Sequence, residues 1–134
     1  MPFKSIIRAE HDLVITVPYG EITNDELPAY YRDRLAEDTL CPGVRELVDG
    51  RWIDAFHVDA YGQRALVRLL TDHRARVEGV RWAFIAGSPL EYGMFRMFEA
   101  QKSDLPFTTS VFDTPAEAAA WLEVPVEAVE HERP

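Results

Sequence analysis

A short run in the middle of the chain, from Trp82 to Ala86, is apolar at every position. The run is too short for a helix, and a strand that is apolar on both sides is one whose two faces are covered. It therefore predicts a central strand of an α/β sheet. The residues that follow predict a helix start, because Gly87 permits a turn, Ser88 can cap the helix, and Glu91 completes a capping box.

The same succession of strand and helix patterns extends through the rest of the chain. Apolar and β-branched residues predict further strands at 3–9, 13–19, 44–49 and 107–112, with the first two joined as a hairpin. Helical spacing predicts helices at about 24–38, 59–77, 88–99 and 114–122. Residues 51–57 have no clear period and predict an irregular connection.

This order predicts an α/β fold with a single mixed, mostly parallel sheet of about five strands. An antiparallel N-terminal edge and four flanking helices complete the predicted architecture. We expect one domain over residues 1–123. Residues 124–134 form an acidic C-terminal tail with little left to pack against, and we expect this tail to be partly disordered.

Composition limits the partners and the compartment. Of the 134 residues, 47% are apolar and 28% are charged, and the net charge is -9. A negative protein repels phosphate backbones, which argues against nucleic acid as a partner. The single cysteine, Cys41, fits a reducing compartment. With no transmembrane segment and no secretory signal pattern in the sequence, we expect a cytoplasmic protein.

Catalytic chemistry has one candidate, the serine at the predicted strand-to-helix turn. Ser88 occupies the place of an α/β-hydrolase nucleophile, and Asp49 with His57 or His73 would supply the other residue types of a triad. The required Gly-x-Ser-x-Gly pattern is absent, and a hydroxyl that caps a helix is a poor nucleophile. No histidine has metal-ligand spacing, and His131 lies in the tail. We predict a non-enzymatic protein without catalytic residues, metal or cofactor.

A binding site is expected beyond the carboxyl ends of the strands, where open α/β sheets hold their ligands. Glu91 disfavours an anion there, because its carboxylate already occupies the positive end of the helix. For Arg51, the alternative is that it simply forms a surface ion pair with Asp49 or Asp54. The candidate residues are Asp49, Arg51, Trp52, Ser88 and Arg96.

Several packing motifs together resemble the SpoIIAA-like family, which belongs with the STAS (sulfate transporter and anti-sigma factor antagonist) and Sec14-like folds. The resemblance covers nearly the whole chain to Leu122, and none of its motifs is catalytic. It implies a domain that acts through a protein partner or a small ligand. The motifs are Tyr19-Gly20-Glu21-Ile22-Thr23, Leu47-Val48-Asp49, Gly93-Met94-Phe95-Arg96-Met97-Phe98-Glu99, and Val111-Phe112-Asp113 followed by Glu117-Ala118-Ala119-Ala120-Trp121-Leu122.

The resemblance also locates a regulatory segment. In anti-sigma factor antagonists, a serine at the start of the helix after the third strand is phosphorylated, and the phosphate breaks binding to the partner kinase. The matching segment here is Asp59-Ala60-Tyr61-Gly62, which lacks that serine. The resemblance therefore implies a STAS-like binding or regulatory domain without the serine switch, with Asp59 and Tyr61 as candidate contacts to a partner.

Two alternatives remain open beside that interpretation. A Sec14-like carrier of a small apolar or amphipathic ligand would need a cavity between the sheet and the helices that carry Leu69, Met94, Met97 and Phe98. A small hydrolase built on Ser88 is the weaker alternative.

Aromatic residues in the segment 52–61, together with Tyr92, suggest an exposed patch, and we expect a homodimer closed by two-fold symmetry. If Trp52 and Phe56 instead fold under their own loop, that patch would not form.

Overall fold

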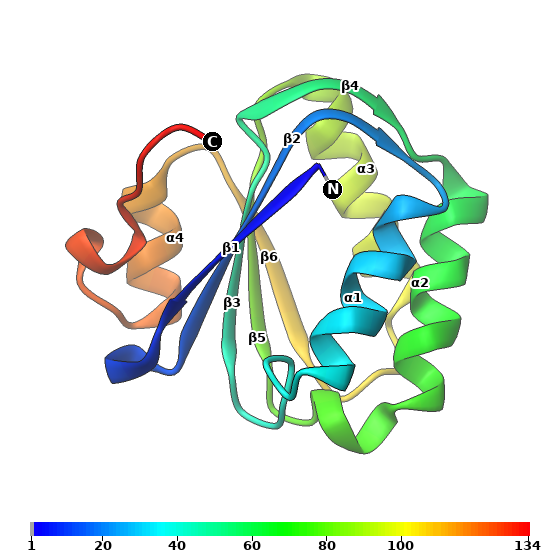
Figure 1. The fold of residues 1–134 in the computed structure, drawn as a ribbon, viewed down its shortest axis with the longest axis horizontal. Helices are drawn as coiled ribbons and strands as arrows, with labels where there is room; N and C mark the ends of the chain where they lie inside the picture. The colour runs from blue at the N-terminus through cyan, green and yellow to red at the C-terminus, as the bar shows by residue number, and fades with distance from the viewer. Residues whose placement is uncertain (1) are drawn as a thin grey trace.

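The computed structural model describes residues 2–134 and contains one six-stranded sheet with helices on both faces (Figure 1). The strands are β1 (Phe3–Arg8), β2 (Leu13–Thr23), β3 (Arg45–Asp49), β4 (Trp52–His57), β5 (Arg81–Ile85) and β6 (Thr108–Phe112). The helices are α1 (Glu26–Ala36), α2 (Ala60–Asp72), α3 (Pro89–Gln101) and α4 (Pro115–Leu122). Short 3-10 helices lie at η1 (Ala9–His11), η2 (Arg74–Val77) and η3 (Val126–Val129).

The strand order is β1-β2-β3-β5-β6, and β4 pairs with β2. Only the β1–β2 pairing is antiparallel, and the other described pairings are parallel. The mixed, mostly parallel sheet with an antiparallel N-terminal edge and four helices is thus confirmed. The central position of the apolar run is also confirmed, because β5 lies between β3 and β6.

The sixth strand corrects the sequence interpretation of residues 51–57. This segment is not irregular: it forms β4, which pairs in parallel with Tyr19–Thr23 of β2. The predicted end of β2 near Tyr19 is wrong for the same reason. The register shifts between Gly20 and Glu21, which pair with Ile53 and Ala55, so the extra residue of this bulge is Asp54 of β4. Gly20 has φ +70°, and β2 bends and continues toward α1 and α2 (Figure 1).

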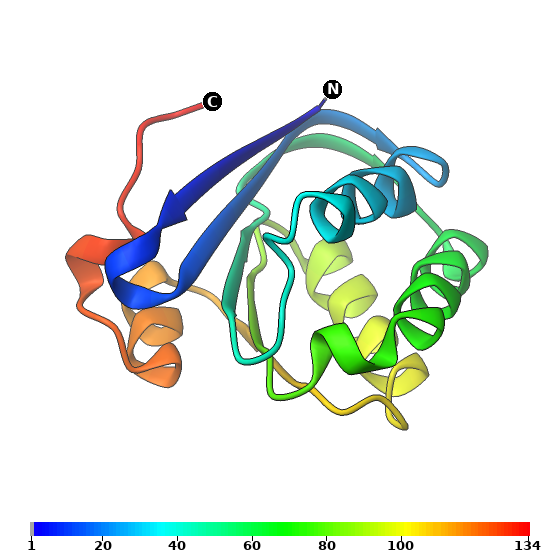
Figure 2. The ribbon, with the colours of Figure 1, turned by 60° about the horizontal axis from the view of Figure 1, so that its bottom comes forward.

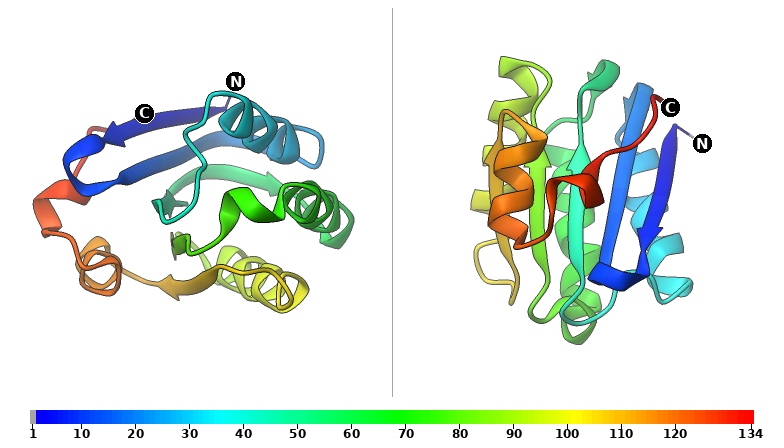
Figure 3. Two further views of the ribbon diagram at one scale, coloured as in Figure 1. Left: turned by 90° about the horizontal axis from the view of Figure 1, so that it is seen from below. Right: turned by 90° about the vertical axis from the view of Figure 1, so that its left-hand side faces the viewer.

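The sheet separates two apolar cores (Figure 3). Helices α1, α2 and α3 cover one face, and α4 with the C-terminal segment covers the other (Figures 1 and 2). Alternate residues of the strands serve the two cores, as the pleat requires. On β5, for example, Trp82 and Phe84 face the three-helix side, whereas Ala83 and Ile85 face α4.

The residues after Glu123 pack more closely than we expected from the sequence. Ala128 and Val129 are buried in the core on the α4 side. The Arg8 guanidinium donates to the backbone oxygens of Ala128, at 3.3 Å, and Glu130, at 2.9 Å. The last residues then cross the strands on this face of the sheet (Figure 3).

Helix boundaries differ from expectation where tertiary contacts or proline decide them. Helix α1 begins at Glu26, whose carboxylate accepts hydrogen bonds from the Thr23 backbone and hydroxyl. Pro28 therefore falls in the first turn, where a missing N–H costs little. Helix α2 ends at Asp72, and η2 continues the chain to Val77. None of the helices in residues 2–134 is long and apolar enough to cross a membrane.

Candidate functional site

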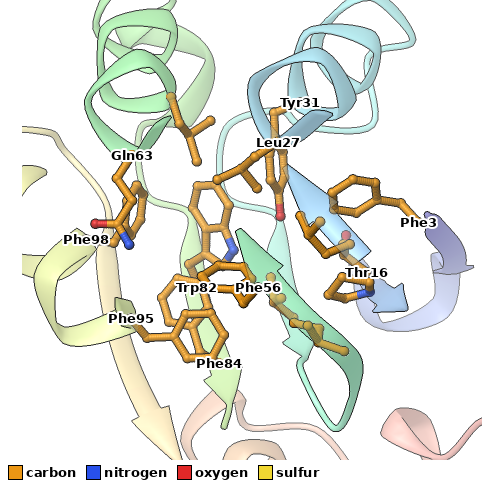
Figure 4. Close-up of a pocket in the computed structure, with 15 residues that line it drawn as sticks. Phe3, Thr16, Leu27, Tyr31, Phe56, Gln63, Trp82, Phe84, Phe95 and Phe98 are labelled. Carbon is orange, nitrogen blue, oxygen red and sulfur yellow. The ribbon is translucent and has the colours of Figure 1, made fainter. Parts of the chain in front are cut away.

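An apolar pocket of about 50 Å³ lies between the sheet and the three helices α1, α2 and α3 (Figure 4). Its floor comes from β2, β3 and β5, and one wall comes from β4, the strand that the sequence interpretation missed. Side chains of the three helices form the remaining walls. The lining residues are Phe3, Thr16, Pro18, Ile22, Leu27, Tyr31, Val48, Ile53, Phe56, Gln63, Leu66, Trp82, Phe84, Phe95 and Phe98.

Aromatic contacts hold the deep part of the pocket in place. The Phe84 and Phe95 rings stack with centroids 4.7 Å apart, which fixes α3 against β5. Trp82 meets Phe98 edge-on at 5.7 Å. Phe56 of β4 reaches Phe95 at 6.5 Å and so connects the outer strand to α3. Packing of this kind leaves the rings little freedom to rotate.

The pocket face of α3 is not the face that the sequence suggested. Phe95 and Phe98 are its buried apolar residues. Phe98 lines the pocket as expected for a carrier, but Met94 and Met97 do not, and Met97 is exposed. Leu69 is buried elsewhere in the same core. Positions 91, 95 and 98 share the inward face of α3 at helical spacing, and the burial of Phe95 and Phe98 leaves Met94 and Met97 off that face.

Two polar atoms at the lining of the pocket are buried without hydrogen-bond partners among the described residues: Trp82 Nε1 and Gln63 Oε1. Gln63 is held in place because its Nε2 donates to the Met94 backbone oxygen at 2.7 Å. In Figure 4 the indole nitrogen of Trp82 points toward the middle of the lining side chains. Buried polar atoms are nearly always paired, so these two atoms leave one donor and one acceptor at the pocket for a bound molecule.

A buried ion pair closes the polar side of the pocket, next to Thr16 and Tyr31. Arg34 of α1 and Glu46 of β3 meet at 2.8 Å, and their side chains are 2% and 0% exposed. The guanidinium also donates to Thr16 Oγ1 at 3.1 Å, and the Thr16 and Tyr31 hydroxyls donate to Glu46. Burial, reinforced by the Glu46 charge, raises the pKa of the Tyr31 phenol well above its usual value. The network is internally satisfied, which indicates a structural role.

The residues expected at the carboxyl ends of the strands form a second cluster. Asp49 is fully buried and accepts hydrogen bonds from Arg51 Nε at 2.9 Å and Nη2 at 2.7 Å. His131 Nε2 lies 2.9 Å from Asp49 Oδ2. Burial by itself raises the pKa of Asp49, but hydrogen bonds from Arg51 and His131 outweigh it, and the net pKa is lowered. The Arg51 guanidinium also lies 4.6 Å from the centre of the Trp52 ring.

The start of α3 is filled by its own glutamate. Glu91 accepts from the Gly87 backbone N–H at 3.1 Å and from the Ser88 hydroxyl at 3.3 Å. A side chain at Gly50 would collide with the Glu91 carboxylate and the Ile85 backbone oxygen. The turn after β3 therefore lies directly against the end of β5 and the start of α3. Burial raises the pKa of Glu91. An anion at this helix start would have to displace Glu91, as the sequence interpretation expected.

Ser88 serves as the cap of α3 rather than being prepared for nucleophilic chemistry. Its hydroxyl oxygen accepts from the Glu91 backbone N–H at 3.2 Å, and its hydroxyl donates to the Glu91 carboxylate. Within residues 2–134, both hydrogen-bond partners of the Ser88 hydroxyl are thus on Glu91, and a histidine base is not among them. Within the same residues, no group of three or more potential ligand side chains is arranged to hold a metal ion.

The remaining candidates do not join this cluster. Asp59 caps α2 by accepting from the Tyr61 and Gly62 backbone N–H groups, as predicted, and these hydrogen bonds, foremost that of Gly62, lower its pKa. The Tyr61 side chain is 70% exposed. Arg96 is exposed and pairs with Glu99 one turn along α3, at 3.3 Å.

Sequence reasoning missed the residues whose partners are distant in the chain. The sequence places His131 in a tail and predicts no role for it, yet its imidazole is 2% exposed and covers Asp49. Gln63 and Glu46 were not singled out. The sequence does contain one signal for Glu46: it is a charged residue next to Leu47 and Val48 in a predicted strand, which indicates a buried polar contact.

Comparison with known proteins supports the fold. No family profile matches the chain, and no curated protein matches it. Among solved structures, it is similar to an uncharacterised protein of the DUF3478 family with a SpoIIAA-like fold from Shewanella loihica PV-4. The two are 17% identical, the match covers 90% of this chain and 91% of the other, and the TM-score is 0.59. The chain therefore has the SpoIIAA-like fold that its motifs suggested.

Proposed function

We propose that this SpoIIAA-like domain is a non-enzymatic binding protein that holds a small apolar or amphipathic ligand in the pocket between the sheet and helices α1, α2 and α3. The observation that carries the proposal is the pocket itself, which is lined almost entirely by aliphatic and aromatic side chains. Small-molecule sites are typically concave and apolar with a few polar groups that fix orientation.

The size of the pocket limits how a ligand would sit. A volume of about 50 Å³ is less than the ~150 Å³ of a cavity that admits benzene, so a whole molecule does not fit inside. The mouth is marked by lining residues that are only half-buried: Phe3, Leu27, Ile53 and Phe56. The ligand would insert one end and leave its body along these side chains.

The experiment is native mass spectrometry of the purified protein, before and after incubation with short-chain alcohols. We expect an added mass on the wild type and its loss in Ile53→Trp, which places a large ring at the mouth. Ile7→Trp is the matched control, because Ile7 is an exposed residue of β1 and 58% of its surface is accessible. A wild type that never carries added mass, or an Ile53→Trp variant that binds normally, would contradict the proposal.

A protein partner is the second candidate. The exposure of Tyr61 favours it, because a large aromatic side chain that is 70% exposed stands in the segment that resembles the regulatory segment of anti-sigma factor antagonists. A pull-down at native expression level with wild type and Tyr61→Ser tests it. Capture of a specific protein that depends on Tyr61 would support this role, and identical profiles for the two baits would count against it.

A further inference from the structure

We infer that the ligand of the apolar pocket is a neutral molecule whose hydroxyl or carbonyl oxygen accepts a hydrogen bond from the indole N–H of Trp82. The inference rests on the ligand-binding function proposed above and adds the chemical class of the ligand. It combines an unpaired donor at the pocket with a lining that offers no free charge.

The donor is unambiguous. An indole N–H can only donate, and Trp82 is 1% exposed, so water outside the protein does not reach it. The ring cannot turn to find another partner, because Tyr31 packs edge-on against it at 5.0 Å and Phe98 packs on it at 5.7 Å. An unpaired buried donor is destabilising, and an acceptor on the ligand would restore the missing hydrogen bond.

The hydroxyl and carboxylate groups on the polar side of the pocket already hydrogen-bond to one another. The Thr16 hydroxyl donates to Glu46 Oε2 at 2.6 Å and accepts from Arg34 at 3.1 Å. The Tyr31 hydroxyl donates to the same carboxylate oxygen at 3.2 Å. Both Glu46 oxygens are held by the Arg34 fork. Gln63 Oε1, the unpaired acceptor of the lining, makes no hydrogen bond with Trp82 Nε1. The acceptor for Trp82 is therefore left to a molecule that enters the pocket.

The charge of the lining excludes an ionised head group. Arg34 lies at the polar side of the pocket, but its guanidinium N–H groups already donate to Glu46, Thr16, Tyr30 and Thr39. No lysine or arginine is part of the lining. A carboxylate in the pocket would be buried beside Glu46 without a counter-charge, which is strongly unfavourable. A cationic head would compete with Arg34 for Glu46. A neutral oxygen avoids both costs.

The test compares three probes with the same six-carbon chain: 1-hexanol, 1-chlorohexane and hexanoate. Isothermal titration gives the affinities, and ¹H–¹⁵N correlation spectra follow the indole N–H signals of Trp52, Trp82 and Trp121. We expect 1-hexanol to bind about tenfold more tightly than 1-chlorohexane, the value of one recovered hydrogen bond, and hexanoate to bind least. The Trp82 indole signal should shift with 1-hexanol, while that of Trp121, on the α4 side, stays in place.

Two outcomes overturn the inference alone: equal binding of 1-hexanol and 1-chlorohexane, or hexanoate binding as tightly as 1-hexanol. If none of the probes binds, the proposed function fails as well, so the two failures are distinguishable. Trp82→Phe should reduce the preference for 1-hexanol over 1-chlorohexane to near unity, with Trp121→Phe as the matched control. The comparison of probes on the wild type needs no variant to fold.

Discussion

The imidazole of His131 lies on the buried carboxylate of Asp49, with Nε2 2.9 Å from Oδ2, although 82 positions separate the two residues in the chain. Nδ1 of the same ring lies 2.8 Å from the Glu132 backbone oxygen. Both ring nitrogens thus face acceptors, and the ring donates to both only when it carries both protons. The contact joins the C-terminal segment to the end of β3 and covers the cluster that the sequence marked as a binding site.

Removing either partner should change stability in a pH-dependent way. Because the pKa of folded Asp49 is lowered, its contribution is present above the ordinary carboxyl pKa of about 4 and is lost as pH falls through the folded value. Asp49→Asn should cost about 1 to 3 kcal/mol at neutral pH, and the difference from wild type should shrink below pH 4. Urea unfolding across this pH range measures it.

The variant His131→Ala provides the complementary test. It removes one donor to the carboxylate, so the pKa of Asp49 should rise back toward its ordinary value, as read by carboxyl NMR titration. His57→Ala is the matched control, because the His57 side chain is 59% exposed. An Asp49 pKa that is unchanged in His131→Ala would show that Arg51 alone holds the carboxylate.

The pair Arg34–Glu46 should be costly to break from one side. Arg34→Met leaves the Glu46 charge buried without its partner, and we expect a loss of about 3 to 5 kcal/mol in the free energy of unfolding. The double variant Arg34→Met with Glu46→Leu should recover part of that loss, because no charge is left buried. A double variant less stable than either single variant would contradict this account.

The helix caps predict smaller effects. Ser88 accepts from the Glu91 N–H, and Thr114 accepts from the Glu117 N–H, both at 3.2 Å. Ser88→Ala and Thr114→Ala should each cost roughly 1 kcal/mol in thermal or urea unfolding while leaving ligand binding in place. If Ser88→Ala kept full stability but lost binding, Ser88 would be a functional residue rather than a cap.

The homodimer stays a prediction, but the aromatic residues expected to form its interface do not lie on one surface. Trp52 packs on the α4 side near His131, whereas Phe56 lines the pocket on the other face, so the two rings do not share one patch. Tyr61 is the exposed aromatic of the segment. Light scattering at micromolar concentration should report a dimer that Trp52→Ala dissociates without unfolding. A monomeric wild type, or a Trp52→Ala variant that unfolds without dissociating, would contradict the dimer and leave Trp52 with only its packing role on the α4 side.

The sequence alone determined those features whose causes lie within a few residues. The apolar run of β5, the turn after it and the Ser88–Glu91 capping contacts follow from neighbouring side chains, and the same holds for Asp59 and Thr114. Strands and helices with strong periodicity fixed the fold class, because alternation and helical spacing are local properties.

Tertiary structure decided the features whose partners are far apart in the chain. β4 is half-exposed and lacks a strict alternation, so its identity depends on the extension of β2 beyond Gly20. The contact of His131 with Asp49 depends on the path of the C-terminal segment across the sheet. The pocket forms only where β2, β4 and β5 meet three helices. No pattern of neighbouring residues predicts that Trp82 lines this pocket with its indole N–H unpaired. Such features arise from packing between elements, which a pattern of neighbouring residues does not specify.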